Sequence, residues 1–252
     1  MTPLFFGSSQ RRLYGAYDPP QGARPGARAV VLCYPWGQEY LRAHRSMRRL
    51  ANMLAAVGCH VLRFDYFGTG DSMGTAQDVT RRGWEQDIET AIEELQDTSG
   101  ATQVSLVGLR LGATLAAHVA VRKKKLVQTL VLWDAVVSGP EYLAELLGAG
   151  QDRGAGPVGG EVEGFPMTDS FAAEIRELDV AALVPVLPAR TRFIHTAPLP
   201  SHTILRAALD SDARAEIPLE SVDALPPWVQ DRDYGAGAVP TKVLETIVQW
   251  VR

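Results

Sequence analysis

The chain has 252 residues, of which 46% are hydrophobic, so it is long enough to bury one large α/β core. Its net charge of −4 excludes a strongly basic nucleic-acid-binding protein, and no apolar run reaches the ~18 residues of a membrane span. The first residues lack the features of a signal peptide. Cys33 and Cys59 lie in or beside expected buried strands without metal-ligand spacing, which indicates reduced thiols and a cytoplasmic location.

Strands and helices are expected in alternation along most of the chain. The expected strands are two short ones within 4–17, then 29–33, 60–65, 103–107, 128–134 and 191–195, with a short one at 213–217. The expected helices are 39–57, 84–95, 111–121, 170–178, 201–209 and 240–251. Short apolar runs followed by amphipathic helices are typical of a doubly wound parallel sheet with helices on both faces. The sequence therefore predicts one α/β domain, residues 1–252.

The alternation breaks after the strand at 128–134. Residues 148–164 are dominated by glycine and carry no hydrophobic periodicity. A loop of this length inside a compact domain is either a functional lid or disordered chain. We therefore expect residues 138–188 to form a cap inserted into the core, with a flexible segment at 148–164.

The segment Gly108-Leu-Arg-Leu-Gly112 lies where a buried strand gives way to a helix. This is the setting of the nucleophile elbow, Gly-x-Ser-x-Gly, in which a strained turn lifts a serine above the sheet. Arg110 occupies the position of the serine. A guanidinium stays protonated and is not a nucleophile.

Together with Tyr34-Pro-Trp-Gly37, this elbow resembles the α/β hydrolase superfamily over nearly the whole chain. The run Asp65-Tyr-Phe-Gly-Thr-Gly-Asp-Ser72 is similar to the Asp-x-x-Gly-x-Gly-x-Ser signature of serine aminopeptidase-like and esterase members. More narrowly, the elbow, the run 132–139 and Glu163-Gly-Phe165 resemble exosortase A system-associated hydrolases. The resemblance implies a mostly parallel sheet of about eight strands with an inserted helical cap.

The resemblance also implies a catalytic serine, an acid, a late histidine and two backbone donors. Arg110 departs from the serine, and the late loop, 228–239, contains no histidine. The backbone donors would be the N–H groups of Leu111 and Trp36, which survive any change of side chain. The acid would follow the strand that ends near His195, or would be Asp134, which could instead form an ion pair with Arg110.

Each candidate residue has a functional and a structural interpretation. Arg110 suits a carboxylate or phosphate ligand, or an internal salt bridge. His195 and His202 are candidate bases, although a histidine at a strand end is more often structural. Aromatic and loop residues around the elbow would line an acyl pocket or pack in the core: Trp36, Gly37, Trp133, Phe165 and Trp228.

Three functions follow from these residues. The first is a pseudo-hydrolase that binds an anionic or acyl small molecule, or a carrier-bound acyl group, in a biosynthetic or export pathway. The second is a lyase, cyclase or isomerase in which Arg110 and the backbone donors stabilise an enolate and a histidine is the base. The third is ordinary ester or thioester hydrolysis. We expect no metal, cofactor, nucleic acid or membrane span, and a homodimer is left open.

Overall fold

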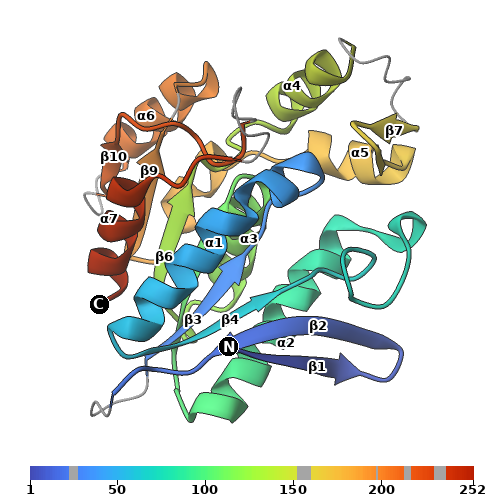
Figure 1. The fold of residues 1–252 in the computed structure, drawn as a ribbon. Helices are drawn as coiled ribbons and strands as arrows, with labels where there is room; N and C mark the ends of the chain where they lie inside the picture. Colours follow the sequence, from blue (N-terminus) through green and yellow to red (C-terminus); the bar gives the residue numbers. More distant parts are fainter. Residues whose placement is uncertain (23–27, 152–159, 197, 213–216, 230–236) are drawn as a thin grey trace.

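The computed structural model describes residues 1–22, 28–151, 160–196, 198–212, 217–229 and 237–252 (Figure 1). Its central element is one eight-stranded sheet. The strands of this sheet are β1 (Thr2–Ser8), β2 (Arg11–Asp18), β3 (Arg28–Cys33), β4 (Cys59–Phe64), β5 (Val104–Leu109), β6 (Val127–Trp133), β9 (Thr191–His195) and β10 (Leu219–Ser221).

The strand order is β1-β2-β4-β3-β5-β6-β9-β10. β1 and β2 pair antiparallel, and β2 pairs antiparallel with β4, whereas all pairs from β4 to β10 are parallel. The carboxyl ends of six strands consequently meet at one edge of the sheet. In open α/β sheets, ligands bind in the crevice outside this edge.

Helices cover both faces of the sheet. The helices are α1 (Gln38–Ala56), α2 (Arg81–Ser99), α3 (Leu111–Arg122), α4 (Gly139–Gln151), α5 (Asp169–Arg176), α6 (Ser201–Ser211) and α7 (Thr241–Val251), with single turns η1 (Ala76–Asp78) and η2 (Ala181–Val186). α1 and α7 pack together on one face, and α2 and α3 pack together on the other (Figure 1). This is the doubly wound architecture that the alternation predicts.

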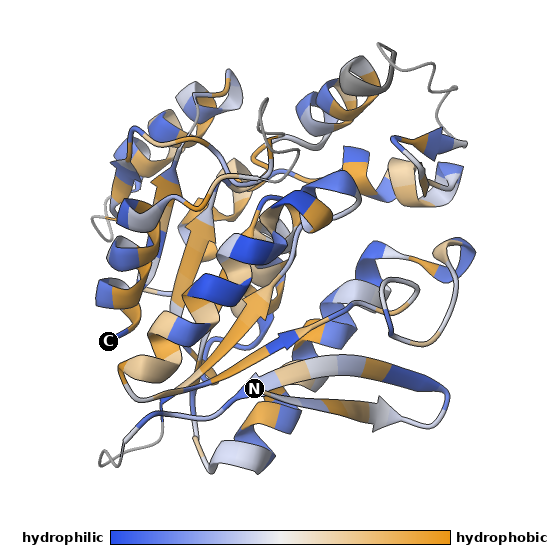
Figure 2. Cartoon of the chain, in the orientation of Figure 1, coloured by the Kyte–Doolittle hydropathy of each residue, from blue (hydrophilic) through white to orange (hydrophobic). Residues whose placement is uncertain are grey.

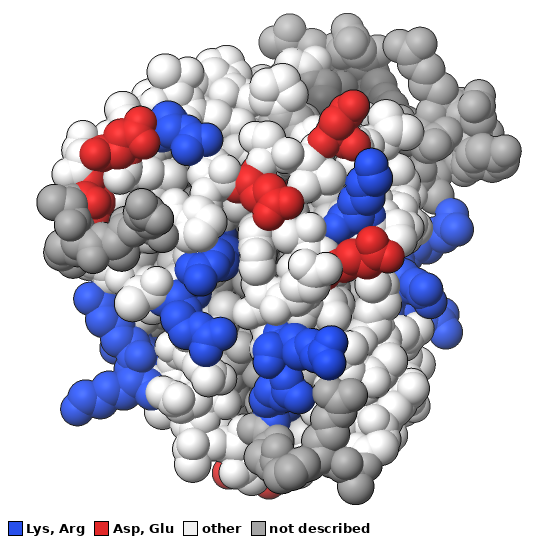
Figure 3. Space-filling model, turned by 90° about the vertical axis from the view of Figure 1, so that its left-hand side faces the viewer, with Lys and Arg blue, Asp and Glu red and all other residues white. Residues whose placement is uncertain are grey.

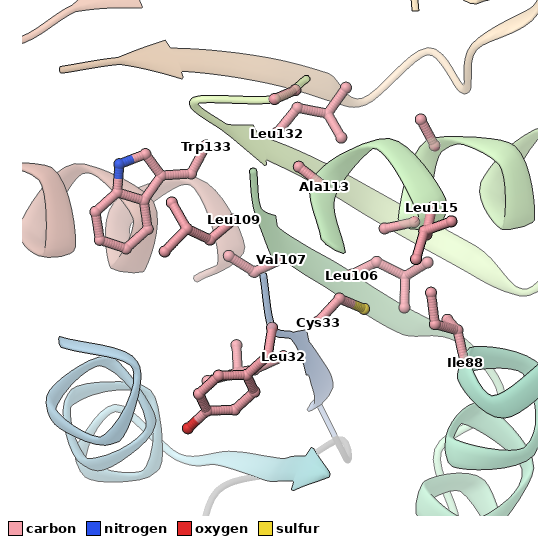
Figure 4. Close-up of a cluster of buried hydrophobic side chains, with 14 of the residues drawn as sticks. Leu32, Cys33, Ile88, Leu106, Val107, Leu109, Ala113, Leu115, Leu132 and Trp133 are labelled. Atoms are coloured by element: carbon pink, nitrogen blue, oxygen red, sulfur yellow. The ribbon is translucent and has the colours of Figure 1, made fainter. Parts of the chain in front are cut away.

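The central strands are apolar along their whole length because both of their faces are covered. Figure 2 shows these strands as hydrophobic and the solvent side of α1 as hydrophilic. Side chains from β3, β5, β6 and α3 meet in the core cluster of Figure 4, where Leu32, Val107, Leu132 and Trp133 are fully buried. Each such side chain stabilises the fold by roughly 1.5–3 kcal/mol through its burial.

The predicted cap corresponds to the segment between β6 and β9. It contains α4, the hairpin of β7 (Glu161–Val162) and β8 (Phe165–Pro166), α5 and η2. An antiparallel bridge joins Ser138, near the start of this segment, to Asp179, just before η2. In the glycine-rich stretch 148–164, α4 continues to Gln151, and residues 152–159 lie outside the described part of the chain.

The strand expected at 213–217 falls almost entirely outside the described residues, so it stays a prediction. Residues 213–216 lie outside the described chain, and the strand that joins the sheet beyond β9 is β10, at Leu219–Ser221. β10 lies at the edge of the sheet and is short and largely polar, so no apolar run marks it in the sequence.

Candidate functional site

The turn between β5 and α3 has the backbone of a nucleophile elbow. Arg110 adopts φ 52° and ψ −124° there, a conformation that costs about 1–3 kcal/mol for a residue with a Cβ. The flanking glycines permit the close approach of α3. A Cβ on Gly108 would lie 2.4 Å from Ala113 Cα, and one on Gly112 would lie 2.2 Å from the carbonyl oxygen of Tyr34. The frame predicted from the sequence is therefore present, with a strained arginine at its centre.

Two carboxylates hold the buried side chain of Arg110. Its Nε donates to Glu39 Oε1 at 2.7 Å, and its Nη2 donates to Glu145 Oε2 at 2.6 Å. The guanidinium carbon lies 3.9 Å from the ring centroid of Trp228. The hydroxyl of Tyr142 donates to the second oxygen of Glu39 at 2.8 Å. Arg110 thereby links α1, α4 and the loop that carries Trp228.

The charge of Arg110 is neutralised within the protein. Burial alone would lower the pKa of Arg110, but Glu39 and Glu145 raise it above its ordinary value, so the side chain stays protonated. Burial raises the pKa of Glu39, and the charge of Arg110 and the hydrogen bonds from Arg110 and Tyr142 oppose that rise. One cation facing two carboxylates offers no net positive charge to an incoming anion. These contacts favour the interpretation of Arg110 as an internal salt bridge.

Asp134 follows β6 and also has a positive φ, 42°. Its carboxylate accepts hydrogen bonds from the backbone N–H of Thr196 at 2.7 Å, from the Thr196 hydroxyl, and from the indole Nε1 of Trp228 at 3.1 Å. Burial raises the pKa of Asp134, while the hydrogen bonds from Thr196 and Trp228 lower it. Thr196 and Trp228 thus hold Asp134 in a fixed position.

Trp228 contacts Asp134 with its N–H and Arg110 with the face of its ring. We call these three residues the central row. The row has the connectivity of an acid–histidine–nucleophile triad, with an indole in place of the imidazole and a guanidinium in place of the hydroxyl. The ion pair considered between Asp134 and Arg110 is not formed, because the carboxylates paired with Arg110 among the described residues are Glu39 and Glu145.

The two backbone groups expected to bind an oxyanion lie on neighbouring segments. Leu111 is the first residue of α3, so its N–H has no acceptor within the helix. Trp36 lies in the loop after β3. Cys33 and Tyr34, which precede it in the chain, pack with their backbone against Gly112. Among the described residues, neither N–H donates a hydrogen bond. Free donors of this kind suit a carbonyl oxygen of a ligand.

A largely apolar cavity of about 270 Å³ lies beside the loop after β3. It is enclosed by that loop, the loop after β4, α2 and the β7–β8 hairpin. Its aromatic lining residues are Trp36, Tyr40, Tyr66, Trp84 and Phe165. Trp36 and Phe165 contact each other edge to face, with ring centroids 6.2 Å apart. An apolar cavity of this size fits a short acyl chain or one aromatic ring.

The residues predicted to bind a ligand fall into two groups. Trp36, Gly37 and Phe165 line the cavity. Trp133 is fully buried in the core cluster of Figure 4, and Trp228 lies against Arg110. The second group does not line the cavity. Trp133 ends β6 and packs in the core, and Trp228 packs against Arg110 in the central row.

The two late histidines pair with each other. His195 ends β9, and His202 lies in the first turn of α6. Their rings stack with centroids 3.5 Å apart, and neither Nε2 has a hydrogen-bond partner among the described residues. Burial lowers the pKa of His195 to about 3 and that of His202 to about 4. No hydrogen bond of the described chain joins either ring to Arg110 or Asp134, so their proposed role as a base stays a prediction.

We expect the histidine pair to destabilise the fold in acid. An unfolded histidine binds a proton near pH 6.5, whereas folded His195 and His202 stay neutral down to about 3 and about 4. The unfolded state therefore binds more protons in this window, and the contribution of the two histidines should lower the free energy of unfolding by about 4 kcal/mol between pH 6.5 and 4.5. Urea unfolding of wild type and H195N/H202N checks this. The variant should show a much shallower pH dependence than wild type. The control H60N removes a histidine that is only partly buried and whose pKa burial lowers less far, so it should alter the slope much less. Equal slopes in all three proteins would contradict the prediction.

Neither a metal centre nor a membrane span is found in the described chain. Its residues include no cluster of three or more His, Cys, Asp or Glu side chains able to hold a metal ion. No described helix is both long and apolar enough to cross a bilayer.

The sequence did not reveal the two carboxylates that pair with Arg110, namely Glu39 and Glu145. Glu39 had a usable signal, because it shares a helix face with Ala43, Met47 and Leu50, all fully buried. A charged residue on the apolar face of a helix is expected to have a buried partner. Glu145 had no such signal, because its side chain is 32% exposed.

Comparisons of the sequence with known proteins point to one family. The family model described as "Serine aminopeptidase, S33" matches residues 28–154. The palmitoyl-protein thioesterase ABHD10, mitochondrial, of Homo sapiens is 28% identical over 116 residues, and the Pongo abelii protein of that name matches equally. The match covers 46% of this chain and 35% of each relative, so the chain corresponds to about a third of their length.

Solved structures match over the whole chain. Est1E from Butyrivibrio proteoclasticus, with ferulic acid bound, has a TM-score of 0.70 at 14% identity and covers 98% of this chain and 96% of its own. The Pyrococcus furiosus esterase PF2001 has a TM-score of 0.70 at 13% identity, with coverages of 99% and 89%. The thioesterase domain from the curacin biosynthetic pathway has a TM-score of 0.59 at 17% identity, and the match covers 88% of this chain and 93% of that domain. Likeness at these identities shows the fold and confirms the predicted fold class.

Proposed function

From the membership of this chain in the serine aminopeptidase S33 family of α/β hydrolases, we propose that it is a binding protein built on a hydrolase scaffold. It binds an acyl or aryl small molecule and does not hydrolyse it through a serine nucleophile. The central row carries this proposal, because Arg110, Trp228 and Asp134 occupy the connectivity of a triad with groups that cannot form an acyl-enzyme.

The cavity supports an acyl or aryl ligand in preference to an anionic one. Its described lining contains no charged side chain, and Arg110 already faces Glu39 and Glu145. Trp36 lines the cavity, and its backbone N–H is available to hold the carbonyl oxygen of such a ligand. Similar proteins are associated with acyl or aryl compounds by name. One is called a palmitoyl-protein thioesterase, and the structure of another contains ferulic acid.

A binding protein of this kind would act as an accessory to enzymes that make or transfer acyl groups. We place that role in a biosynthetic or export pathway of the cytoplasm. Ordinary hydrolysis, as the names of the relatives suggest, is the alternative that the experiment below separates.

We expect no covalent labelling by a fluorophosphonate probe and no turnover of p-nitrophenyl esters. Calorimetric titration with ethyl ferulate and with decanoyl-pantetheine should detect binding of at least one of the two. Both W36A and F165A should weaken it by about tenfold or more, since each removes an aromatic wall of the cavity. The matched control is F5A, whose ring is 56% exposed and far from the cavity in the fold. Labelling at any serine with ester turnover would overturn the proposal.

A further inference from the structure

Three arginines, Arg45, Arg48 and Arg49, lie on the solvent side of α1, and we call them the basic stripe. All three are exposed, and within the described residues none of them pairs with a carboxylate. Arg42, one turn earlier, differs because it pairs with Glu163 at 3.2 Å. The basic stripe thus places on one helix three cations that pair with no carboxylate of the described residues, in a chain with a net charge of −4.

The basic stripe surrounds a hollow in the surface. Arg45, Arg48, Arg49, Asn52 and Val239 line a shallow depression of about 480 Å³. Figure 2 shows the hydrophilic side of α1 turned away from the sheet. On the adjoining side of the molecule, shown in Figure 3, Lys and Arg side chains gather in the middle and lower part. A basic, shallow surface of this kind suits the side chains of a second protein more than a small molecule, which needs a deeper pocket.

The same helix connects the basic stripe to the mouth of the cavity. Tyr40 and Leu41 in the first turn of α1 line the cavity, and Leu41 is 54% exposed at its edge. Arg45 follows one turn later and Arg48 after another, so the stripe starts about 6 Å from the mouth and extends about 6 Å along the helix axis. A partner bound to the stripe would stand directly beside the entrance.

We propose that the basic stripe docks an acidic carrier protein that delivers the acyl or aryl group to the cavity on a flexible arm. This inference rests on the proposed function, because it supplies the source of the ligand. Carboxylates spaced three and four residues apart on a partner helix match the spacing of Arg45, Arg48 and Arg49. A nucleic acid is disfavoured, because binding of a polyanion commonly uses 6–10 phosphate contacts and the rest of this chain is acidic.

The test uses three probes with the full chain: decanoyl-pantetheine, an unloaded bacterial acyl carrier protein, and the same carrier loaded with a decanoyl group. Calorimetry should show that the loaded carrier binds more tightly than either of the other probes, and that carrier affinity falls steeply from 50 to 300 mM salt. R45E/R48E/R49E should lose about tenfold or more of its affinity for both carrier forms and keep its affinity for decanoyl-pantetheine. The matched control K124E/K125E/R190E reverses three exposed charges at the opposite edge of the sheet and should bind all probes as wild type does.

The outcomes separate the two proposals. If decanoyl-pantetheine and ethyl ferulate both fail to bind while the unloaded carrier binds in a stripe-dependent way, the cavity proposal fails and the docking surface stands. If the free thioester binds but the stripe variant binds the carrier as wild type does, the docking proposal is overturned. A second result would also overturn the docking proposal. In that case the wild type does not bind the carrier but binds a 20-base-pair DNA duplex or anionic phosphatidylglycerol vesicles, and the stripe variant loses this binding.

Discussion

Replacing Glu39 with alanine is expected to lower the free energy of unfolding by about 3–5 kcal/mol. Glu39 is 5% exposed and accepts from both Arg110 and Tyr142. Its removal leaves a buried guanidinium and a buried hydroxyl each short of one partner, and the cost of such desolvated groups exceeds that of the lost bonds. Urea unfolding at pH 7 monitored by circular dichroism measures the change.

Glu145 provides the matched control, because it pairs with the same guanidinium from a side chain that is 32% exposed. E145A should cost about 1 kcal/mol or less, since solvent already screens this pair. The double variant R110M/E39M should recover much of the loss of E39A, because it removes both charges together. Equal destabilisation by E39A and E145A would show that burial does not set the strength of these two pairs.

Introducing a serine and a histidine into the central row, together with one compensating substitution, is expected to create esterase activity. In R110S/E39Q/W228H, a serine occupies the elbow, an imidazole replaces the indole that contacts Asp134, and the buried carboxylate left without its cation is neutralised. A positioned base raises the rate by about 10²–10⁴-fold. Hydrolysis of p-nitrophenyl acetate should therefore exceed that of R110S/E39Q by at least about 100-fold.

The comparison with R110S/E39Q isolates the histidine, because both variants carry the serine and the same neutral residue 39. Fluorophosphonate labelling of the triple variant, absent from wild type, gives an independent readout of an activated Ser at position 110. An inactive triple variant with a wild-type circular dichroism spectrum would mean that the central row lacks the geometry of a triad, despite having its connectivity.

The sequence predicts the interior of the fold well for a physical reason. A strand buried on both faces must be apolar throughout, so β3, β5 and β6 appear as continuous runs with bounds correct to within one or two residues. α2 begins at Arg81, earlier than the apolar periodicity indicates, because Thr80 caps it by accepting from the N–H of Gly83. β10, at Leu219–Ser221, was not predicted, because a short edge strand is not constrained to be apolar.

The site was predicted only as far as local chain geometry determines it. The elbow could be recognised because Gly108 and Gly112 mark it in the sequence: Gly108 is required by the close approach of Ala113 in the same turn, and Gly112 by the backbone of Cys33 and Tyr34. The partners of Arg110 lie 71 and 35 residues away along the chain, and their proximity depends on how α1 and α4 pack over the sheet edge. The contact of Trp228 with both Arg110 and Asp134 likewise depends on tertiary packing of a loop, which no local pattern encodes.

Under the proposed binding function, the salt-bridged arginine would also determine by which route a ligand enters. Arg110 and Glu39 belong to the core, whereas Glu145 and Tyr142 belong to α4 of the inserted segment. Lifting α4 as a lid would therefore break an ion pair and a buried hydrogen bond in a single movement. Entry is easier past Leu41 on the first turn of α1, where the wall of the cavity is already open to solvent. A serine at position 110 would remove the ion pair with Glu145, and with it one of the two contacts described above that fasten α4 to the core.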